Sequence, residues 1–168
     1  GTLRVADAPE PADAFLIAVP TPIQPDKRAD LTAVRAAARA VAPQLRRGNL
    51  VVLESTSPPR TTVDIVAPLL AESGLRPGED FWLAYSPERV LPGQILRELV
   101  ENARVVGGIN RASAEAGRDL YAAFVRGEIV LTDATTAEMV KLMENTYRDV
   151  NIAVANEFAS LAERFGVE

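Results

Sequence analysis

The 168-residue sequence contains no cysteine and no histidine. The absence of cysteine excludes disulfide bonds and thiol nucleophiles within the chain. The absence of histidine removes the commonest general base and the commonest metal ligand. We therefore expect no metal site, and any acid–base chemistry must come from lysine, glutamate, aspartate, tyrosine or water.

The sequence also lacks a basic excess and a long hydrophobic run. Its formal net charge is −5 and its isoelectric point is near 4.9, so the basic surface typical of nucleic-acid-binding proteins is missing. No apolar run reaches about 18 residues, the length that indicates a membrane span. The first fifteen residues lack the basic start and apolar core of a signal peptide. These features predict a cytoplasmic protein with neither nucleic-acid nor membrane partners.

A glycine-rich phosphate loop is missing as well. Dinucleotide-binding folds normally carry GxGxxG after their first strand, and the nearest candidate, residues 106–108 (VGG), comes late and lacks the third glycine. The first apolar run, residues 14–19, would begin a sheet whose inner edge is unpaired. We expect that the chain is a piece of a larger protein, with the first βαβ half before Gly1 and more substrate domain after Glu168.

Short apolar runs alternate with helical patterns along most of the chain. The runs have the length of buried strands and cover residues 14–19, 50–53, 81–85, 104–106 and 128–131. The helical patterns between them cover residues 31–46, 61–73 and 111–125. This alternation is typical of right-handed βαβ units. The sequence therefore predicts an α/β fold with a parallel sheet, and the alternation gives way to a long helix near residues 132–134.

Residues 135–165 contain no glycine or proline and predict a single long helix. Thr135 and Glu138 have the spacing of a capping box, and Gly166 follows as a stop. An apolar stripe on this helix is the expected core face, and it comprises Met143, Tyr147, Val150, Val154, Phe158, Leu161 and Phe165. The second half is apolar or small on two faces, which favours packing on both sides, and a partner subunit is one candidate.

The first half of this helix also carries a polar stripe. At about 100° per residue, Lys141, Asn145 and Arg148 fall within about 60° of one another. On spacing alone, such a stripe is most often a solvated helix face. The rest of the chain must therefore decide whether these three side chains form a site.

Three polar turns follow the first three predicted strands, at residues 20–22 (PTP), 54–58 (ESTSP) and 86–89 (SPER). Any one of them is adequately explained as a loop that caps the next helix. However, ligands of such sheets bind at the carboxyl ends of the strands. Three such turns at one edge favour a binding crevice.

Four segments resemble the nucleotide-sugar dehydrogenases, the family of the UDP-glucose, GDP-mannose and UDP-N-acetylmannosamine dehydrogenases. They are AVPTP at 18–22, LESTSPP at 53–59, SPERVLPGQ at 86–94 and KLMENTYRDVNIAVANEFA at 141–159. The segments cover nearly the whole chain in the family's order. The PERVLPGQ form is most similar to the UDP-N-acetyl-D-mannosamine branch.

The resemblance implies oxidation of the C6 alcohol of a UDP-sugar to a carboxylate in two steps with NAD as cofactor, in polysaccharide biosynthesis. It implies that residues 1–132 are the second half of a Rossmann-like NAD-binding domain and that residues 133–168 open a helical domain for substrate binding and homodimer formation. By the same resemblance, Thr21 and Thr56 line the NAD site. The family's nucleophilic cysteine would lie beyond Glu168, so the chain alone should not complete the oxidation.

The resemblance also assigns the sugar site. It implies that Lys141 is catalytic near the sugar C6 oxygen and that Asn145 helps to hold this oxygen. Glu88 would lie beside the sugar and hold a water molecule or balance the lysine charge. The implied substrate-binding residues are Arg89, Val90 and Arg148. Lysine and asparagine one helical turn apart provide the preorganised donors that an oxyanion needs.

Two alternative functions stay open. β-Hydroxyacid dehydrogenases of the 6-phosphogluconate type also place lysine and asparagine at i and i+4 on a long interdomain helix, but they do not resemble this chain at residues 54–59 or 86–94. The second alternative is a non-catalytic fragment that binds a nucleotide sugar or forms dimers through the long helix. The absent cysteine and the absent glycine loop are the features that favour it.

Overall fold

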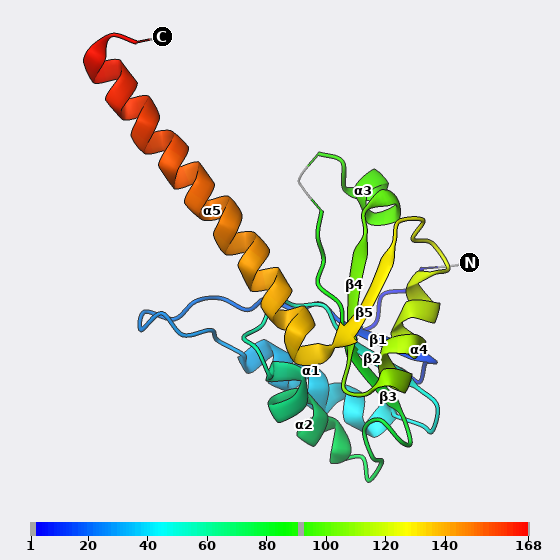
Figure 1. Cartoon of the computed structure of the whole chain (residues 1–168). Coiled ribbons are helices and arrows are strands. Elements are labelled where there is room, and N and C mark those ends of the chain that lie inside the picture. Colours follow the sequence, from blue (N-terminus) through cyan, green and yellow to red (C-terminus); the bar gives the residue numbers. More distant parts are fainter. Residues whose placement is uncertain (1–2, 91–92, 168) are drawn as a thin grey trace.

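The computed structural model describes residues 3–90 and 93–167, and in these residues five strands form one sheet in the order β1-β2-β3-β4-β5 (Figure 1). The strands are β1 (Ala14–Ile17), β2 (Leu50–Leu53), β3 (Trp82–Tyr85), β4 (Arg104–Gly108) and β5 (Ile129–Asp133). Each predicted apolar run overlaps one of these strands, and β4 and β5 extend two residues beyond their predicted runs. The α/β class and the Rossmann-like sheet are confirmed.

The sheet is not parallel throughout, which corrects one prediction. The strands β1, β2 and β3 pair in parallel, and so do β4 and β5, but β3 and β4 pair antiparallel through Ala84–Gly108 and Tyr85–Gly107. The connection between them contains α3 (Ile95–Glu101), a seven-residue helix that the sequence did not predict. A crossover helix must bury one side on the sheet, whereas α3 has no buried residue and lies near the start of β4 (Figure 1). The chain therefore turns back beside β3.

Two of the predicted helices, at 31–46 and 61–73, are not regular α-helices throughout, and each contains a proline. The pattern at 31–46 becomes α1 (Thr32–Val41) and a 3₁₀ turn, η1 (Ala42–Gln44), because Pro43 follows directly. The pattern at 61–73 becomes a π-helical turn, η2 (Thr62–Val66), and α2 (Ala67–Ala71), which contains Pro68. Proline has no amide hydrogen for the ladder of an α-helix, and π-turns of this kind occur frequently at functional sites.

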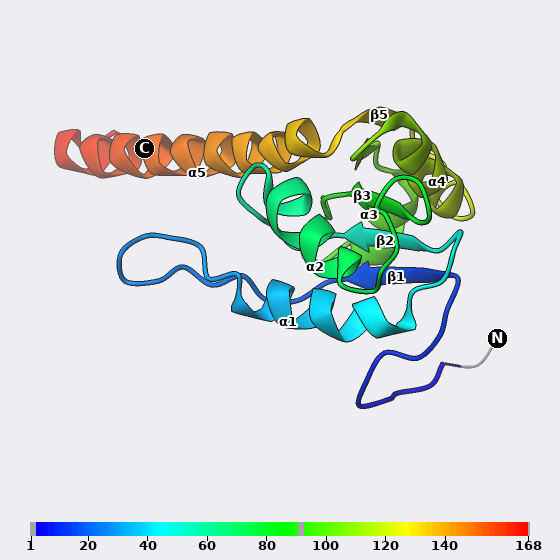
Figure 2. The ribbon, with the colours of Figure 1, turned by 90° about the horizontal axis from the view of Figure 1, so that it is seen from below.

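Helices cover both faces of the sheet, and β2 separates the two apolar cores. Its residues Val51 and Leu53 pack toward α1 and α2, whereas Leu50 and Val52 pack toward α4 (Arg111–Tyr121). Figure 2 shows α1 and α2 on one side of the strands and α4 on the other. Side chains of a strand alternate between faces, so a continuous apolar run such as LVVL is what a strand covered on both faces requires.

The long helix α5 (Ala134–Phe165) begins one residue earlier than predicted, and its cap differs from the prediction. Asp133 is the N-cap and accepts a hydrogen bond from the Thr136 amide at 2.9 Å. The predicted capping box of Thr135 and Glu138 is therefore wrong, because Glu138 is fully buried and bonds to another part of the chain. Gly166 ends the helix with a φ of 65°, as predicted.

The helix starts in close contact with β4 and then leaves the sheet (Figure 1). A Cβ atom at Gly107 would lie 2.4 Å from the Asp133 carbonyl oxygen and 2.7 Å from the Ala137 Cβ, so only glycine permits this approach. Beyond Asn145, the helix extends past the other elements. The predicted core stripe from Met143 to Phe165 is consequently exposed, with exposed fractions between 46 and 76%. Among the described helices, none is long and apolar enough to cross a membrane.

Candidate active site

The turns after β1 and β2 are joined by hydroxyl groups. The Ser55 hydroxyl accepts a hydrogen bond from the Val19 amide at 2.8 Å and donates one to the Val19 carbonyl oxygen at 2.7 Å. The Thr21 hydroxyl donates to the Thr56 carbonyl oxygen at 2.7 Å. Because β1, β2 and β3 are parallel, these turns share one edge with the turn after β3. The two predicted cofactor residues therefore lie side by side.

The turn after β3 receives the long helix. The Lys141 ammonium donates a hydrogen bond to the backbone carbonyl oxygen of Glu88. The Glu88 carboxylate folds back onto its own turn and accepts a hydrogen bond from the Val90 amide. Lys141 thus contacts the backbone carbonyl oxygen of Glu88. That the Glu88 side chain holds a water molecule or balances the lysine charge stays a prediction.

Burial lowers the pKa of Lys141, and the charges of Glu88 and Glu144 oppose this shift. The half-buried amine therefore loses its proton more readily than an exposed lysine does. An amine of this kind serves as a proton acceptor or donor near neutral pH better than an ordinary lysine.

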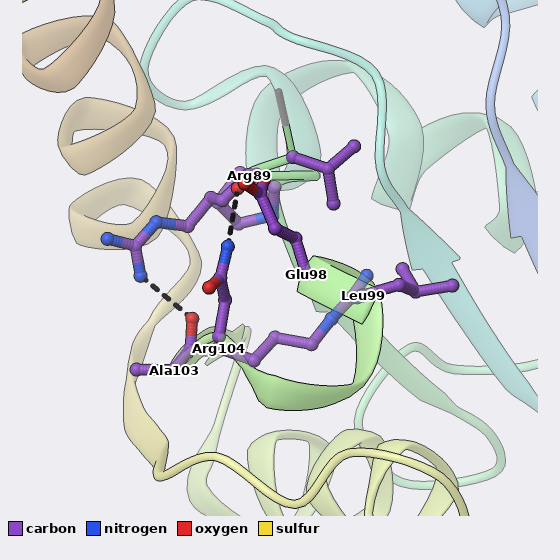
Figure 3. Close-up of a pocket in the computed structure, with 8 residues that line it drawn as sticks. Arg89, Glu98, Leu99, Ala103 and Arg104 are labelled. Atoms are coloured by element: carbon purple, nitrogen blue, oxygen red, sulfur yellow. Dashed lines mark hydrogen bonds between the residues drawn. The ribbon is translucent and has the colours of Figure 1, made fainter. Parts of the chain in front are cut away.

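Glu144 is a candidate site residue that was not predicted from the sequence. Its carboxylate accepts two hydrogen bonds from the Arg89 guanidinium, one of them from Nε at 3.0 Å. Arg89 also donates through Nη1 to the Ala103 carbonyl oxygen at 3.0 Å (Figure 3). A two-point contact of this kind fixes the orientation of a guanidinium group. The available signal was spacing, because Glu144 lies three residues after Lys141 and hence on the same side of the helix.

Asn145 and Arg148 contact each other. The Arg148 guanidinium donates to the Asn145 side-chain oxygen at 2.7 Å. This bond uses the acceptor atom of the amide, so Nδ2 is the atom that can donate to a ligand. The three residues of the predicted polar stripe thus lie on one face, with Lys141 partly buried against the Glu88 turn and Arg148 exposed.

An open hollow of about 300 Å³ lies between this face and the turn after β3. It is lined by Arg89, Val90, Glu98, Asn102, Lys141, Glu144, Asn145 and Arg148. Five predicted site residues are among them, whereas Glu88, Thr21 and Thr56 are not among its lining residues. With Lys141 protonated, three cationic and two acidic side chains line it, and this excess of positive charge suits an anionic ligand.

A buried ion pair supports the turns after β2 and β3. Arg104 is 6% exposed, and its guanidinium contacts the Glu54 carboxylate at 2.6 Å and the Ser86 hydroxyl at 2.9 Å. The Tyr121 hydroxyl donates to the same carboxylate at 2.5 Å, and the Tyr121 ring lies 3.7 Å from the guanidinium carbon. Burial and the Glu54 charge raise the pKa of Tyr121. No sequence spacing connects these residues, so this pair could not be predicted from the sequence.

Comparison with known proteins identifies the family. Residues 1–125 match the NAD-binding domain of the UDP-glucose/GDP-mannose dehydrogenase family, and residues 135–168 match the central domain of the same family. The chain therefore belongs to the UDP-glucose/GDP-mannose dehydrogenase family. NAD is the cofactor of the domain that most of the chain matches.

Several relatives resemble the chain closely. The UDP-N-acetyl-D-mannosamine dehydrogenase of Methanocaldococcus jannaschii is 53% identical over 170 residues, which cover 99% of this chain and 38% of that protein. The NDP-N-acetyl-D-galactosaminuronic acid dehydrogenase of Ralstonia solanacearum is 53% identical over 174 residues, which cover 99% of this chain and 41% of that protein. The solved structure of the UDP-D-ManNAc dehydrogenase of Pyrococcus horikoshii has a TM-score of 0.89 at 53% identity. The match covers 94% of this chain and 38% of that one. The chain thus spans about two fifths of the length of these relatives.

Proposed function

We propose that this chain is part of an NAD-dependent nucleotide-sugar dehydrogenase that oxidises the C6 alcohol of a UDP-sugar, of the UDP-N-acetylmannosamine type, to the carboxylate. The observation that carries the proposal is the contact between Lys141 and the Glu88 turn, beside a hollow that Asn145 and Arg148 also line. A solvated helix face would place the lysine in water. Here the amine is partly buried where a sugar hydroxyl has room to bind.

The residues of the hollow account for the first oxidation. The neutral Lys141 amine takes the proton of the C6 hydroxyl group while a hydride leaves C6 and the C–O bond becomes double. Asn145 donates a hydrogen bond through Nδ2 to the oxygen as negative charge develops on it. Arg89 and Arg148 bind the diphosphate as guanidinium groups do. The second oxidation requires a nucleophile, and this chain contains no cysteine to provide one.

The residues at the strand edge fit part of an NAD site. Thr21 and Thr56 lie at the carboxyl ends of parallel strands, which is where dinucleotides bind to such sheets. When bound, NAD⁺ accepts the hydride. We assign Thr21 and Thr56 to this site, while the pyrophosphate needs a glycine-rich loop that no segment of the sequence provides.

We further propose that residues 1–132 are the second half of the NAD-binding domain and that residues 133–168 open the central domain. The start of α5 at Ala134 and the two family matches support this division. We also propose that the full-length protein is a homodimer in which the apolar second half of α5 is covered. The exposed stripe, which includes Tyr147, Phe158 and Phe165, supports this proposal.

The proposed function is tested by NADH formation in the full-length parent protein. UDP-N-acetylmannosamine, UDP-glucose, GDP-mannose and 6-phosphogluconate serve as substrates in parallel. We expect two NADH per molecule of UDP-N-acetylmannosamine, and none from the 168-residue chain alone. Turnover of the hydroxyacid without turnover of any sugar nucleotide would establish the hydroxyacid alternative. Tight sugar-nucleotide binding without NADH formation would establish the non-catalytic alternative, and steady NADH formation by the isolated chain would disprove its predicted incompleteness.

The Arg89–Glu144 contact predicts how substrate binding changes when Glu144 becomes glutamine. Glu144→Gln removes one charged partner of Arg89, so we expect the KM for the sugar nucleotide to rise about tenfold, as for one lost charged hydrogen bond. The Glu144 charge also raises the pKa of Lys141, so the inflection of the kcat–pH profile should move to lower pH. Steady-state kinetics across pH measures both effects.

Glu79→Gln is the matched control for this variant, since Glu79 forms an exposed ion pair with Arg76. This control should leave both quantities unchanged. An unchanged KM and an unchanged pH profile for Glu144→Gln would show that Arg89 is oriented without Glu144.

A further inference from the structure

Glu138 is a fully buried carboxylate on α5, three residues before Lys141. It makes no capping contact with its own helix. Its Oε2 accepts a hydrogen bond from the Arg60 amide at 2.5 Å. Its Oε1 accepts from the Thr62 amide at 2.7 Å and from the Thr62 hydroxyl at 2.6 Å. One side chain of the helix that bears Lys141 thus binds a segment more than seventy residues earlier in the chain.

The segment that Glu138 binds has an unusual backbone. Arg60 has a φ of 73°, in the left-handed region that residues other than glycine rarely adopt. The π-helical turn η2 begins at Thr62. The first amides of a helix have no partner within it and favour a negative charge. Glu138 provides both the acceptor and the charge. Its carboxylate therefore holds Arg60 in the left-handed conformation and the start of η2 in place.

The same segment is connected rigidly to Thr56. Pro58 and Pro59 lie between Thr56 and Arg60, and each proline restricts the backbone. The Thr61 hydroxyl donates to the Pro58 carbonyl oxygen at 2.6 Å. These restraints tie the position of Arg60 to the turn that follows β2.

Glu138 also lies near the end of β3. Burial and the charge of Glu138 raise the pKa of Tyr85, the residue directly before the turn that contacts Lys141. A residue needed only for packing would be apolar at this depth, as its buried neighbours Ala134 and Ala137 are. Burial of a carboxylate is costly unless its oxygens are bonded, and here all three bonds come from Arg60 and Thr62, just after the turn that follows β2.

We propose that Glu138 is a positioning residue that holds the cofactor-binding turn after β2, residues 54–59, at a set distance from Lys141. This inference rests on the proposed function, in which Thr56 contacts the cofactor and Lys141 contacts the sugar. Hydride transfer requires both reactants in one precise arrangement, since a displacement of about 1 Å costs about 10²-fold in rate. Glu138 connects the two halves of the site without touching either ligand.

The test replaces Glu138 with glutamine in the full-length parent protein. Glutamine has the same shape, but its NH₂ group would face one of the two amides, so the turn loosens. For Glu138→Gln we expect the KM for NAD⁺ to rise about tenfold, equivalent to one lost charged hydrogen bond. We also expect a lower kcat and an unchanged KM for the sugar nucleotide. Hydrogen exchange at the Arg60 and Thr62 amides should become faster.

Two further variants complete the experiment. Thr62→Val removes only the hydroxyl donor, so it should act in the same direction more weakly, and its effect should be non-additive with Glu138→Gln. Glu115→Gln removes a carboxylate from an exposed ion pair with Arg111 and should change none of these quantities. Calorimetry of NAD⁺ binding provides a readout that does not depend on turnover.

Each outcome decides the proposal. A lower melting temperature with unchanged kinetic constants would show that Glu138 serves only the fold, and an equal rise in both KM values would show that it does not act on the cofactor turn. If the wild-type protein shows no sugar-nucleotide turnover, the proposed function fails. In that case the inference is still judged by NAD⁺ binding and exchange: faster exchange with weaker binding supports it, and unchanged binding overturns it.

Discussion

Lys141→Met is expected to lower kcat of the full-length protein about 10³-fold, because positioned proton transfer and donation to an oxyanion each contribute on this scale. The amine contacts the Glu88 carbonyl oxygen beside the hollow, and methionine fills similar space without a donor. Steady-state NADH formation measures the loss. Lys27→Met, at an exposed position in the loop before α1, is the matched control and should retain full activity.

The pH dependence distinguishes the role of Lys141 from simple packing. Burial lowers the pKa of Lys141, and the neutral amine is the form that accepts the proton of the alcohol. Consequently kcat should rise with pH as the amine loses its proton, with an inflection below the ordinary lysine value of about 10.4. Lys141→Arg stays protonated at every accessible pH, so it should lose this inflection and recover little activity. A Lys141→Met protein with wild-type kcat would refute the proposed chemistry.

Arg104→Met is expected to cause the largest loss of stability, about 3–5 kcal/mol in the free energy of unfolding. The substitution leaves the Glu54 carboxylate without its cation in a site where Arg104 is 6% exposed, and it removes the donor to Ser86. An unpaired charge in a poorly solvated site is costly. Urea unfolding of the 168-residue chain, followed by the fluorescence of Trp82 in β3, measures the change.

Two controls separate the loss of the ion pair from the loss of side-chain volume. Arg111→Met breaks an exposed pair with Glu115 and should leave the free energy of unfolding nearly unchanged. The double variant Arg104→Met with Glu54→Leu contains no unpaired charge, so it should be more stable than Arg104→Met alone. A double variant that is less stable than the single one would contradict this explanation.

Much of the fold could be predicted because local patterns determine it. Runs such as LVVL at 50–53 have no polar position, so they suit only strands covered on both faces. The long helix and its end at Gly166 followed from the absence of breakers and from one glycine in the left-handed region. The direction of β4 could not be predicted, because it depends on whether the connection through α3 crosses a face of the sheet and not on the β4 residues themselves.

The candidate site also contains residues that local spacing predicts and residues that only packing brings together. Lys141, Asn145 and Arg148 were found because helical spacing places them on one face, and the turns at 20–22, 54–58 and 86–89 were found because each follows a strand. Glu138 was assigned to a capping box because its spacing from Thr135 fits that motif equally well. Its buried bonds to Arg60 and Thr62 depend on the packing of α5 against η2.

The sequence by itself therefore determined which elements form and which chemical groups each one carries, because periodicity, capping and turn chemistry act over a few neighbouring residues. Only the tertiary structure decided the antiparallel return of β4, the pairing of Glu144 with Arg89 and of Arg104 with Glu54, and the exposure of the apolar stripe on α5. These contacts join residues that are far apart in the chain. Their formation depends on how whole elements pack, which no local spacing specifies.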